Sequence, residues 1–313
     1  MNPLSTIYGA VTSYRNRLYD GARLPIHRLR GPVISVGNLS TGGSGKTPFV
    51  ILLGEELQRR GVSFDILSRG YGRHSRGVRL VDPSGIASDF GDEPLLLARR
   101  LNIPVIVGES RLAAGLFAEK KFGPQLHLLD DGFQHRSLHR DFDIVLFSVA
   151  DAKDGLLPTG RLREPLSSLA RADALVFTNA SGSRTSLEGK LLWRVQRGVE
   201  LIHPPARPIV FCGIARPENF LSQLREAGVV PAAHAFFRDH HAYTGPDLRR
   251  LLALRQQHSA GGFLTTEKDL INLGPRSAQL HPLSVARVTI EFSEPVDAVD
   301  TMLRIIDERR SRS

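Results

Sequence analysis

A glycine-rich segment at residues 40–47, Ser-Thr-Gly-Gly-Ser-Gly-Lys-Thr, restricts the fold of this chain more than any other feature. It follows the short β-branched stretch 32–36 and leads into residues 46–60, whose pattern predicts a helix. A strand, a glycine-rich loop and a helix in this order are typical of a phosphate-binding loop. Glycines let backbone N–H groups approach phosphate oxygens, and the helix N-terminus adds the positive end of its dipole. The segment therefore predicts a nucleotide-binding α/β domain.

The positions within this loop predict separate roles. Lys46 is expected to reach the β- and γ-phosphates, and the Thr47 hydroxyl is expected to coordinate Mg²⁺. Ser40 stands where such loops usually carry their first glycine, although Gly42 and Gly43 keep the loop glycine-rich. The expected phosphate-binding residues are Thr41, Gly42, Gly43, Ser44, Gly45, Lys46 and Thr47.

Two adjacent carboxylates, Asp130 and Asp131, follow an apolar, strand-like stretch at residues 125–129. An enzyme with a phosphate loop needs an acidic group at the end of a nearby strand to organise Mg²⁺, and either aspartate can supply it. A guanine-reading Asn-Lys-x-Asp motif is not supported, because residues 178–181 lack its Lys and Asp and residues 266–269 lack its Asn. ATP is therefore the expected nucleotide.

Short apolar segments alternate with helical patterns through the first part of the chain. This alternation predicts a mostly parallel sheet with helices on both faces. We expect an α/β fold of the P-loop NTPase-like class, with a second, smaller α/β domain. Strands are expected at residues 32–36, 64–67, 104–107, 125–129, 143–147 and 174–177, and helices at 46–60 and 94–100.

A proline-rich connector at residues 203–208 indicates a domain boundary. Beyond it, a strand is expected at 209–212 and another at 284–292, with helices at 219–227, 247–256 and 296–309. We therefore divide the chain into an N-terminal amphipathic, membrane-contacting helix (1–25), a P-loop domain (26–203) and a smaller α/β domain with connector strands and the terminal helix (204–313).

Composition limits the class of protein and its partners. The chain has 41 basic and 32 acidic residues, a net charge of +9, and most of the basic residues are arginines, which suit phosphate recognition. With 41% hydrophobic and 23% charged residues, a disordered chain, a fibre and a multispan membrane protein are excluded. The single cysteine, Cys212, excludes an intramolecular disulfide and a cysteine metal cluster, and it fits a reducing cytoplasm.

The N-terminal residues predict an amphipathic helix rather than a signal peptide. Apolar residues recur at helical spacing from Leu4 to Leu18, and arginines follow them. Such a helix can lie in a membrane interface with its basic side toward anionic lipid, or it can pack on the protein body. No run of 18 or more apolar residues predicts a membrane-spanning helix.

Several motifs, in order along the chain, resemble those of the tetraacyldisaccharide 4′-kinase (lipid A 4′-kinase) family. The loop at residues 36–48 fits, because the family's loop also lacks the first glycine. The resemblance covers nearly the whole chain. The further motifs are Ser-Arg-Gly-Tyr-Gly-Arg (68–73), Gly-Asp-Glu-Pro (91–94), Asp-Asp-Gly-Phe-Gln-His (130–135), Leu-Arg-Glu-Pro (162–165), Phe-Arg-Asp-His (237–240) and Thr-Glu-Lys-Asp (266–269).

The resemblance implies an ATP-dependent kinase that phosphorylates the 4′-hydroxyl of tetraacyldisaccharide 1-phosphate, a glycolipid, to give lipid IVA in lipid A biosynthesis. It also implies a position on the cytoplasmic face of the inner membrane, either peripheral or with the N-terminal helix as an anchor. With a phosphate loop and acidic groups in place, ATP and Mg²⁺ are the expected cofactors. We expect a monomer with no nucleic-acid partner.

The resemblance further implies the catalytic residues. Asp92, in Gly-Asp-Glu-Pro, is expected to be the general base that takes the proton of the acceptor hydroxyl. The family pairs this aspartate with a histidine of the second domain, and His240 is the expected match, with the adjacent His241 as the alternative. Lys46 completes the expected catalytic set.

Metal and substrate contacts are implied in the same way. Asp130 or Asp131, together with Thr47, is expected to hold Mg²⁺, and Glu164 is a further expected metal contact. Arginine side chains suit the 1-phosphate of the lipid, and a tyrosine suits packing on a sugar ring. The expected substrate-binding residues are Arg69, Tyr71, Arg73, His135 and Arg163.

Two other classes of protein remain open at this stage. A P-loop switch ATPase would share the loop and the carboxylates but would need no sugar–lipid site. A nucleic-acid-binding module is suggested by net charge alone, and no recognisable zinc-finger, RNA-recognition or helix-turn-helix signature supports it.

Overall fold

A computed structural model of the chain describes residues 2–42, 45–178, 189–293 and 297–312. Gly43 and Ser44, two of the expected phosphate-binding residues, lie outside the described residues. The α-helices are α1 (Pro3–Asp20), α2 (Lys46–Arg59), α3 (Ala87–Phe90), α4 (Asp92–Leu101), α5 (Arg111–Phe122), α6 (Val149–Ala152), α7 (Pro217–Glu226), α8 (Gly245–Gln257), α9 (Glu267–Leu273) and α10 (Ala298–Ser311). Two short 3₁₀ helices are η1 (Leu166–Arg171) and η2 (Gly274–Gln279).

The strands of the described chain form one sheet of twelve, in the order β10-β9-β11-β12-β8-β7-β6-β1-β5-β2-β4-β3. Their bounds are β1 (Val33–Asn38), β2 (Phe64–Ser68), β3 (Arg79–Leu80), β4 (Val105–Val107), β5 (Leu126–Asp130), β6 (Phe142–Phe147), β7 (Ala174–Thr178), β8 (Leu191–Leu201), β9 (Ile209–Cys212), β10 (Ala233–Phe236), β11 (Phe263–Thr266) and β12 (Leu283–Phe292). Only the β3–β4 and β8–β12 pairs are antiparallel. The expected mostly parallel α/β sheet is confirmed.

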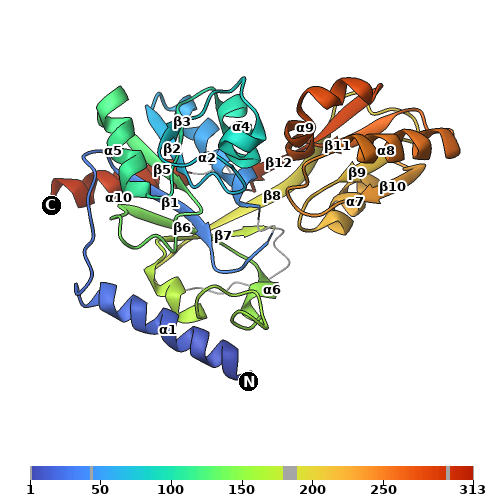
Figure 1. Cartoon of the computed structure of the whole chain (residues 1–313). Coiled ribbons are helices and arrows are strands. Elements are labelled where there is room, and N and C mark those ends of the chain that lie inside the picture. Colours follow the sequence, from blue (N-terminus) through green and yellow to red (C-terminus); the bar gives the residue numbers. More distant parts are fainter. Residues whose placement is uncertain (1, 43–44, 179–188, 294–296, 313) are drawn as a thin grey trace.

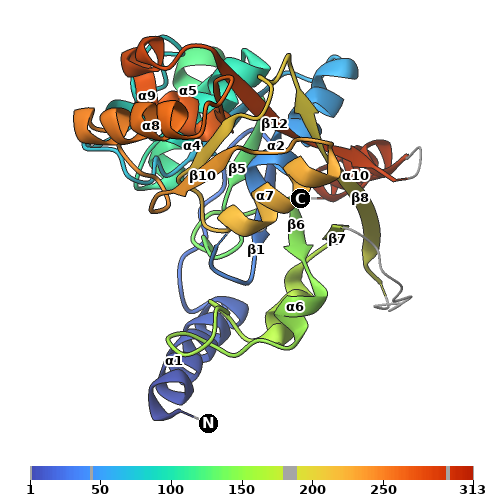
Figure 2. The same cartoon turned by 90° about the vertical axis from the view of Figure 1, so that its right-hand side faces the viewer.

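The β8–β12 pair joins two parts of the molecule (Figure 1). We call the part with β1–β7 and α2–α6 the main half, and the part with β9–β11 and α7–α9 the smaller half. The early residues of β8 pair with β7, while its later residues pair only with β12, which in turn pairs with β11. The two strands therefore carry the chain from the main half to the smaller half and back. In Figure 2, turned by 90°, α1 stands below the main half.

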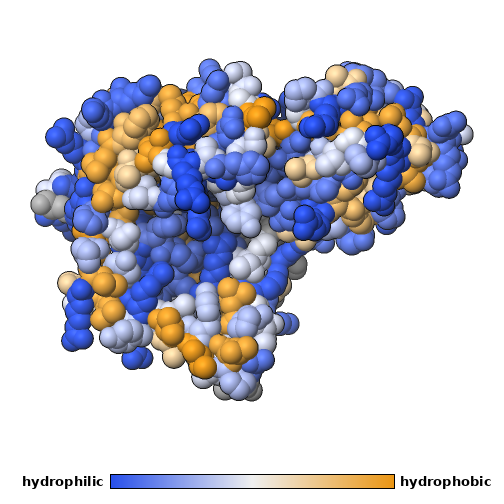
Figure 3. Space-filling model, viewed as in Figure 1, coloured by the Kyte–Doolittle hydropathy of each residue, from blue (hydrophilic) through white to orange (hydrophobic). Residues whose placement is uncertain are grey.

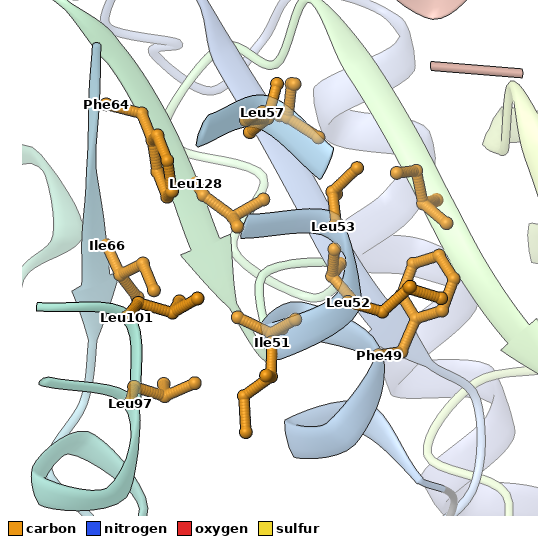
Figure 4. Packing of buried hydrophobic residues seen from close by; sticks show 14 of the residues in the cluster. Phe49, Ile51, Leu52, Leu53, Leu57, Phe64, Ile66, Leu97, Leu101 and Leu128 are labelled. Atoms are coloured by element: carbon orange, nitrogen blue, oxygen red, sulfur yellow. The ribbon is translucent and has the colours of Figure 1, made fainter. Parts of the chain in front are cut away.

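The largest hydrophobic cluster lies between α2 and the central strands of the main half. Phe49, Leu53 and Leu57 of α2 are fully buried. Figure 4 shows Leu53 and Leu57 near Leu128 of the sheet. The Phe49 ring lies 6.3 Å, centre to centre, from each of the rings of Trp193 and Phe292. Burial of each such side chain contributes about 1.5–3 kcal/mol to folding. This cluster fixes α2, and with it the loop that precedes α2, against the sheet.

The terminal helix α10 packs into this same cluster through Val299, Met302 and Ile306. Arg60, which follows α2, adds an ion pair to Asp300 at 2.7 Å. We had grouped this helix with the smaller domain, and that grouping is corrected: its apolar residues, spaced at helical intervals, complete the core of the main half. The division of the rest of the chain at residue 204 stays a prediction.

The expected strands and helices are present, with ends within two residues of the expected positions, except that the N-terminal helix ends at Asp20 rather than at residue 25. The strands β3, β10 and β11 and the helix α5 were not expected. The strand β8 was not expected either. Its residues alternate between buried Trp193 and Val195 and outward Leu192 and Arg194, a half-buried pattern that fits a strand with one face on the core. Residues 3–20 form the expected N-terminal helix.

Candidate functional site

The phosphate loop leads directly into α2. Gly42 and Gly45 have φ values of +82° and +83°, a region that suits glycine. Lys46 Nζ donates a hydrogen bond to Asn38 Oδ1 at 2.9 Å, while Thr47 Oγ1 donates to Glu93 Oε1 at 3.1 Å. These contacts place the Lys46 ammonium and the Thr47 hydroxyl at the carboxyl end of β1, beside the loop.

Thr41 differs from the other expected phosphate contacts. Its backbone N–H donates to Arg161 O at 2.8 Å, so this N–H is already used within the protein. Its hydroxyl oxygen lies 3.3 Å from the same carbonyl oxygen. Thr41 nevertheless lines the cavity described below.

Asp130 ends β5, the strand next to β1, and its carboxylate is buried. It accepts a hydrogen bond from Ser68 Oγ at 3.1 Å. Burial, reinforced by the nearby charges of Glu93 and Asp131, raises the pKa of Asp130 to about 6. A buried carboxylate with a raised pKa is a group that gains from a nearby cation.

Asp131 follows Asp130 with a left-handed backbone, φ 54°. Arg163 donates to its Oδ2 at 2.8 Å, and Lys46 Nζ lies 3.4 Å from its Oδ1. Burial alone would raise the pKa of Asp131, but the charges of Lys46 and Arg163 outweigh it and hold the pKa below its ordinary value. The two adjacent aspartates therefore have opposite electrostatic environments.

Asp92 and His240 come from different halves and meet at the first turn of α4. His240 Nδ1 donates to Asp92 Oδ2 at 2.8 Å and lies 3.0 Å from Oδ1. Burial alone would raise the pKa of Asp92, but the His240 hydrogen bond and the Lys268 charge outweigh it and lower the pKa. The same hydrogen bond raises the pKa of His240. His241 instead contacts Asp247 at 3.0 Å within the smaller half, so His240 is the partner of Asp92.

Sequence reasoning missed three residues beside this pair. Lys268 of α9 forms an ion pair with Glu93, the neighbour of Asp92 on α4, and Asn272 donates to Asp92 Oδ2 at 3.1 Å. Burial would lower the pKa of Lys268, but the charges of Glu93 and Asp92 raise it. Residues 268 and 272 are four apart on one helix, a spacing that places both on one face and could have indicated a shared target.

One cavity of about 840 Å³ is lined by most of these groups, although Asp92 and Asn272 are not among its lining residues. Its walls carry the phosphate loop, both aspartates, Glu93, His240 and Lys268 from the two halves, with part of α1 closing one side. In Figure 3 a hollow with largely hydrophilic walls lies between α1 at the lower edge and the body above it. The cavity has room for a nucleotide and part of a second substrate.

Most of the expected substrate-binding residues line this cavity: Arg69, Tyr71, His135 and Arg163. Burial, with the charge of Arg111, lowers the pKa of His135 to about 4, so its ring is neutral at pH 7. Arg111 also lines the cavity and was missed, because nothing local distinguishes it from other arginines on a helix. Burial lowers the pKa of Arg111 to about 10.

Arg73 differs from the other expected substrate-binding residues. Its guanidinium forms an ion pair with Glu109 at 2.6 Å and donates to Gly77 O at 2.8 Å. The chain turns sharply at Gly70 and Gly72, both with positive φ. Tyr71 lines the cavity, whereas Arg73 points to Gly77 and Glu109. Arg73 is therefore not among the residues that line this cavity, and its contact with the substrate stays a prediction.

Glu164 is buried beside α1. Asn16 donates to its Oε2 at 2.7 Å, and Arg171 pairs with the same oxygen at 2.9 Å. Its Oε1 has no hydrogen-bond partner among the described residues, and the residue lines the cavity. A metal contact through Glu164 stays a prediction.

The residues present fit a metal ion that is held partly by other ligands. In the described part of the chain, no three His, Cys, Asp or Glu side chains converge on one point as a protein-only cage. Mg²⁺ does not require such a cage, since it commonly binds one or two carboxylates together with phosphate and water oxygens. Asp130, Asp131 and the Thr47 hydroxyl, all lining one cavity beside the loop, meet that requirement.

An apolar stripe on α1 faces solvent. It consists of Leu4, Ile7, Val11 and Tyr14, each about 60% exposed (61, 60, 62 and 63%). The opposite side of the helix is tied to the body, where Ser5 Oγ donates to Leu156 O and Tyr8 Oη to Arg163 O, both at 3.0 Å. Among the described helices, none combines the length and hydropathy that a bilayer crossing requires.

The chain is similar to a known family and to several named relatives. The model of the tetraacyldisaccharide-1-P 4′-kinase family matches residues 1–307. A tetraacyldisaccharide 4′-kinase of Koribacter versatilis is 47% identical over 321 residues, covering 99% of this chain and 100% of the relative. The enzyme of that name from Aquifex aeolicus is 39% identical over 291 residues, covering 87% of this chain and 88% of the relative.

A solved structure extends the similarity to three dimensions. The crystal structure described as the "apo" form of LpxK from Aquifex aeolicus in complex with ATP superposes with a TM-score of 0.78 at 33% identity. The match covers 97% of this chain and 98% of that chain. The expected fold class and the family resemblance are confirmed: the chain belongs to the tetraacyldisaccharide-1-P 4′-kinase family.

Proposed function

We propose that this chain transfers the γ-phosphate of ATP to the 4′-hydroxyl of tetraacyldisaccharide 1-phosphate and so forms lipid IVA in lipid A biosynthesis. Family membership and the names of its relatives support this pair of substrates. The observation that carries the proposal is that one cavity is lined by both the phosphate loop and His240, whose Nδ1 is hydrogen-bonded to the buried carboxylate of Asp92. A switch ATPase needs the loop but has no use for a base placed to receive a proton from a second substrate.

On the nucleotide side, the loop and Lys46 bind the β- and γ-phosphates and neutralise their charge. Thr47, Asp130 and Asp131 would hold Mg²⁺, and the bound ion would neutralise charge on the phosphates during transfer. The buried carboxylate of Asp130, whose pKa is raised, supports a cation at this place. Glu164, with one oxygen left without a partner, is the proposed further contact.

On the acceptor side, Asp92 takes the proton of the 4′-hydroxyl while the hydroxyl oxygen forms its bond to the γ-phosphorus and ADP leaves. The lowered pKa of Asp92 keeps the carboxylate ionised at neutral pH, as a base requires. His240 holds the carboxylate in place through Nδ1–H. Lys268 neutralises the adjacent Glu93, which limits repulsion between the two neighbouring carboxylates.

The lipid headgroup is proposed to occupy the part of the cavity near Arg69, Tyr71, His135 and Arg163. Guanidinium groups bind phosphate in a bidentate manner, which suits the 1-phosphate of the substrate. The Tyr71 ring lies 5.3 Å, centre to centre, from the His240 ring, so a sugar packed on Tyr71 would lie close to the catalytic pair.

The apolar stripe of α1 is the proposed contact with the bilayer on the cytoplasmic face of the inner membrane. Apolar side chains in the headgroup region, with arginines beside them, bind anionic membranes. The helix also lines the cavity through Tyr8 and Asn16, so a lipid held there would have its headgroup next to the phosphate loop. One chain supplies every group named here, which is compatible with a monomer.

Transfer of labelled γ-phosphate from ATP to purified tetraacyldisaccharide 1-phosphate in detergent tests the proposal. The wild-type chain is expected to label the lipid, and Lys46→Ala is expected to lose transfer by about 10³-fold, because a cation at the phosphates is removed. Circular dichroism of both proteins checks that the fold is kept. Hydrolysis of ATP without a labelled lipid would reject the proposal in favour of a switch ATPase.

A further inference from the structure

Three neighbouring parallel strands of the smaller half end on residues that contact one another. Gly213 directly follows β9, His240 lies in the loop after β10, and Asp269 lies in the first turn of α9, directly after β11. The carboxyl ends of parallel strands meet at one edge of a sheet, so these segments share a single surface. His240 has a role in the proposed reaction, whereas Asp269 and Gly213 have none.

Asp269 is fully buried, yet its carboxylate is well supplied with donors. Its Oδ1 accepts hydrogen bonds from the Gly213 N–H and the Tyr243 O–H, both at 2.7 Å, and its Oδ2 accepts one from Thr266 Oγ1 at 2.5 Å. Burying a carboxylate is costly unless its oxygens are satisfied, so this arrangement holds the three donors in fixed places.

The Gly213 peptide connects Asp269 to the catalytic histidine. The backbone N–H of Gly213 donates a hydrogen bond to Asp269 Oδ1. Its carbonyl oxygen accepts a hydrogen bond from the backbone N–H of His240 at 3.1 Å. His240 has φ 57°, a left-handed conformation that costs energy for a residue with a Cβ and needs support from its surroundings. The hydrogen bond to Gly213 O supplies that support, and His240 Nδ1 then lies 2.8 Å from Asp92 Oδ2.

The loop that carries His240 rests directly on this peptide. A Cβ added at Gly213 would lie 2.7 Å from Arg238 O, 3.0 Å from His241 Cβ and 3.3 Å from Asp269 Oδ1, all closer than normal contacts. The position of residues 238–241 is therefore set by where the Gly213 peptide lies, and Asp269 sets that position.

We propose that Asp269 is a positioning residue for the reaction: by anchoring the Gly213 peptide, it places His240 in hydrogen-bonding reach of Asp92. Its effect on transfer rests on the proposed function, whereas its effect on the geometry of His240 does not. Because Asp269 acts through His240, the loss of kcat on its removal cannot exceed the loss in His240→Ala.

Asp269→Ala removes the anchor and is expected to lower kcat by about tenfold, with KM for ATP changed less than twofold, since misplacement of a catalytic group costs rate rather than nucleotide binding. Asp269→Asn keeps an oxygen acceptor for the Gly213 N–H and is expected to restore most of kcat. Tyr243→Phe is the matched control, because it removes a different donor from the same oxygen and is expected to keep kcat within about twofold.

A double-mutant cycle separates positioning from general destabilisation. In the His240→Ala background, Asp269→Ala is expected to cost less than a further twofold in kcat. A tenfold loss in both backgrounds would overturn the proposal. If Asp269→Ala does not fold, Gly213→Ala provides the same test, since its added Cβ displaces residues 238–241 while Asp269 is kept. Gly213→Ala is expected to lower kcat in the wild-type background and to leave it unchanged in the His240→Ala background. A loss of kcat by the same factor in both backgrounds would overturn the proposal.

Nitrogen-15 NMR of the histidine rings gives a readout that does not depend on activity. The resonance of the Nδ1–H bound to Asp92, assigned by its absence in His240→Ala, is expected in the wild type and Asp269→Asn and to be lost or shifted in Asp269→Ala. An unchanged resonance in folded Asp269→Ala would reject the positioning role even if no kinase activity were found. A wild type without lipid transfer but with the expected NMR change would reject the proposed function alone.

Discussion

The main half and the smaller half both present functional residues at the carboxyl ends of parallel strands, but they do so in different ways. In the main half, continuous sequence motifs follow β1 and β5, and the groups in each motif act together where they stand. In the smaller half, His240, Lys268 and Asn272 come from separate segments, and each contacts a carboxylate of α4 in the main half.

This difference separates two kinds of chemistry. Phosphate binding needs several backbone N–H groups and one cationic side chain from consecutive residues, which a single loop can provide. Proton transfer to a base needs a carboxylate whose orientation and charge are set by partners, and here those partners arrive only when the smaller half contacts α4. We therefore expect the main half to supply the phosphate contacts, and we expect proton transfer to require both halves.

The largest expected effect is the loss of kcat when the proposed base of the main half, Asp92, is replaced. Asp92→Asn keeps the size of the side chain but cannot accept a proton, and we expect kcat to fall by about 10³-fold. KM for ATP should change little, because the phosphates are bound by the loop. Initial rates of lipid phosphorylation measure both constants, and a loss smaller than tenfold would remove Asp92 from the role of base.

Removing its partner in the smaller half should cost less. His240→Ala is expected to lower kcat by about 10- to 100-fold, because the histidine positions the base and does not accept the transferred proton. His241→Ala is the matched control, since His241 contacts Asp247 and not Asp92. We expect its kcat within about threefold of wild type, and equal losses in the two variants would contradict the assignment of His240.

A smaller effect is expected at α1, outside both halves. Ile7→Asp combined with Val11→Asp places two charges on the exposed stripe and should weaken binding to anionic vesicles by at least about tenfold. Leu252→Asp, on exposed α8 of the smaller half, is the control and should not change vesicle binding. Co-sedimentation at constant salt measures the affinities, and equal binding by all three proteins would exclude α1 as the membrane contact.

The smallest effect concerns stability across the two halves. The pKa of His240 is raised, so its pairing stabilises the fold fully below about pH 6.5 and is lost as pH rises through the folded value. The pKa of Asp92 is lowered, so its share is present above about pH 3.9 and is lost as pH falls through the folded value. Wild type and His240→Ala should therefore differ most between these limits.

Denaturant unfolding at about pH 5.5 and about pH 9 measures this difference. We expect the free energy of unfolding to differ by roughly 1–2 kcal/mol at the lower pH and by less at the higher pH. A difference that does not change with pH would mean that the charge on His240 does not contribute to the contact between the halves.

Local signals predicted most of the main half. Residues 40–47 and 130–131 identified the phosphate loop and the carboxylates, because glycines, a lysine and acidic groups act within a few residues of one another. The strand β8 was missed because outward-facing charged residues interrupt its apolar positions. The place of α10 was wrong because an amphipathic pattern shows that a helix packs but not on which partner.

The residues of the candidate site also differ in how far local sequence predicted them. Asp92 and His240 were named only through the resemblance to a family, since a lone aspartate before Glu-Pro is typical of any helix start. Arg73 was assigned to the substrate by its motif, and after the turn at Gly70–Gly72 its guanidinium pairs with Glu109. Whether two residues as close as Tyr71 and Arg73, two positions apart, face the same cavity depends on the backbone between them, which the motif alone does not specify.

The sequence by itself determined the fold class, the nucleotide loop and the family, because these depend on hydrophobic periodicity and on residues adjacent in the chain. The tertiary structure alone decided which histidine meets Asp92, that Lys268 and Asn272 join it, and that α10 completes the main core. Those contacts join residues far apart in the chain: Asn272 and Asp92 are 180 positions apart, and Asp300 and Arg60 are 240 positions apart. They form only when burial of apolar faces brings distant segments together, and no local propensity encodes that encounter.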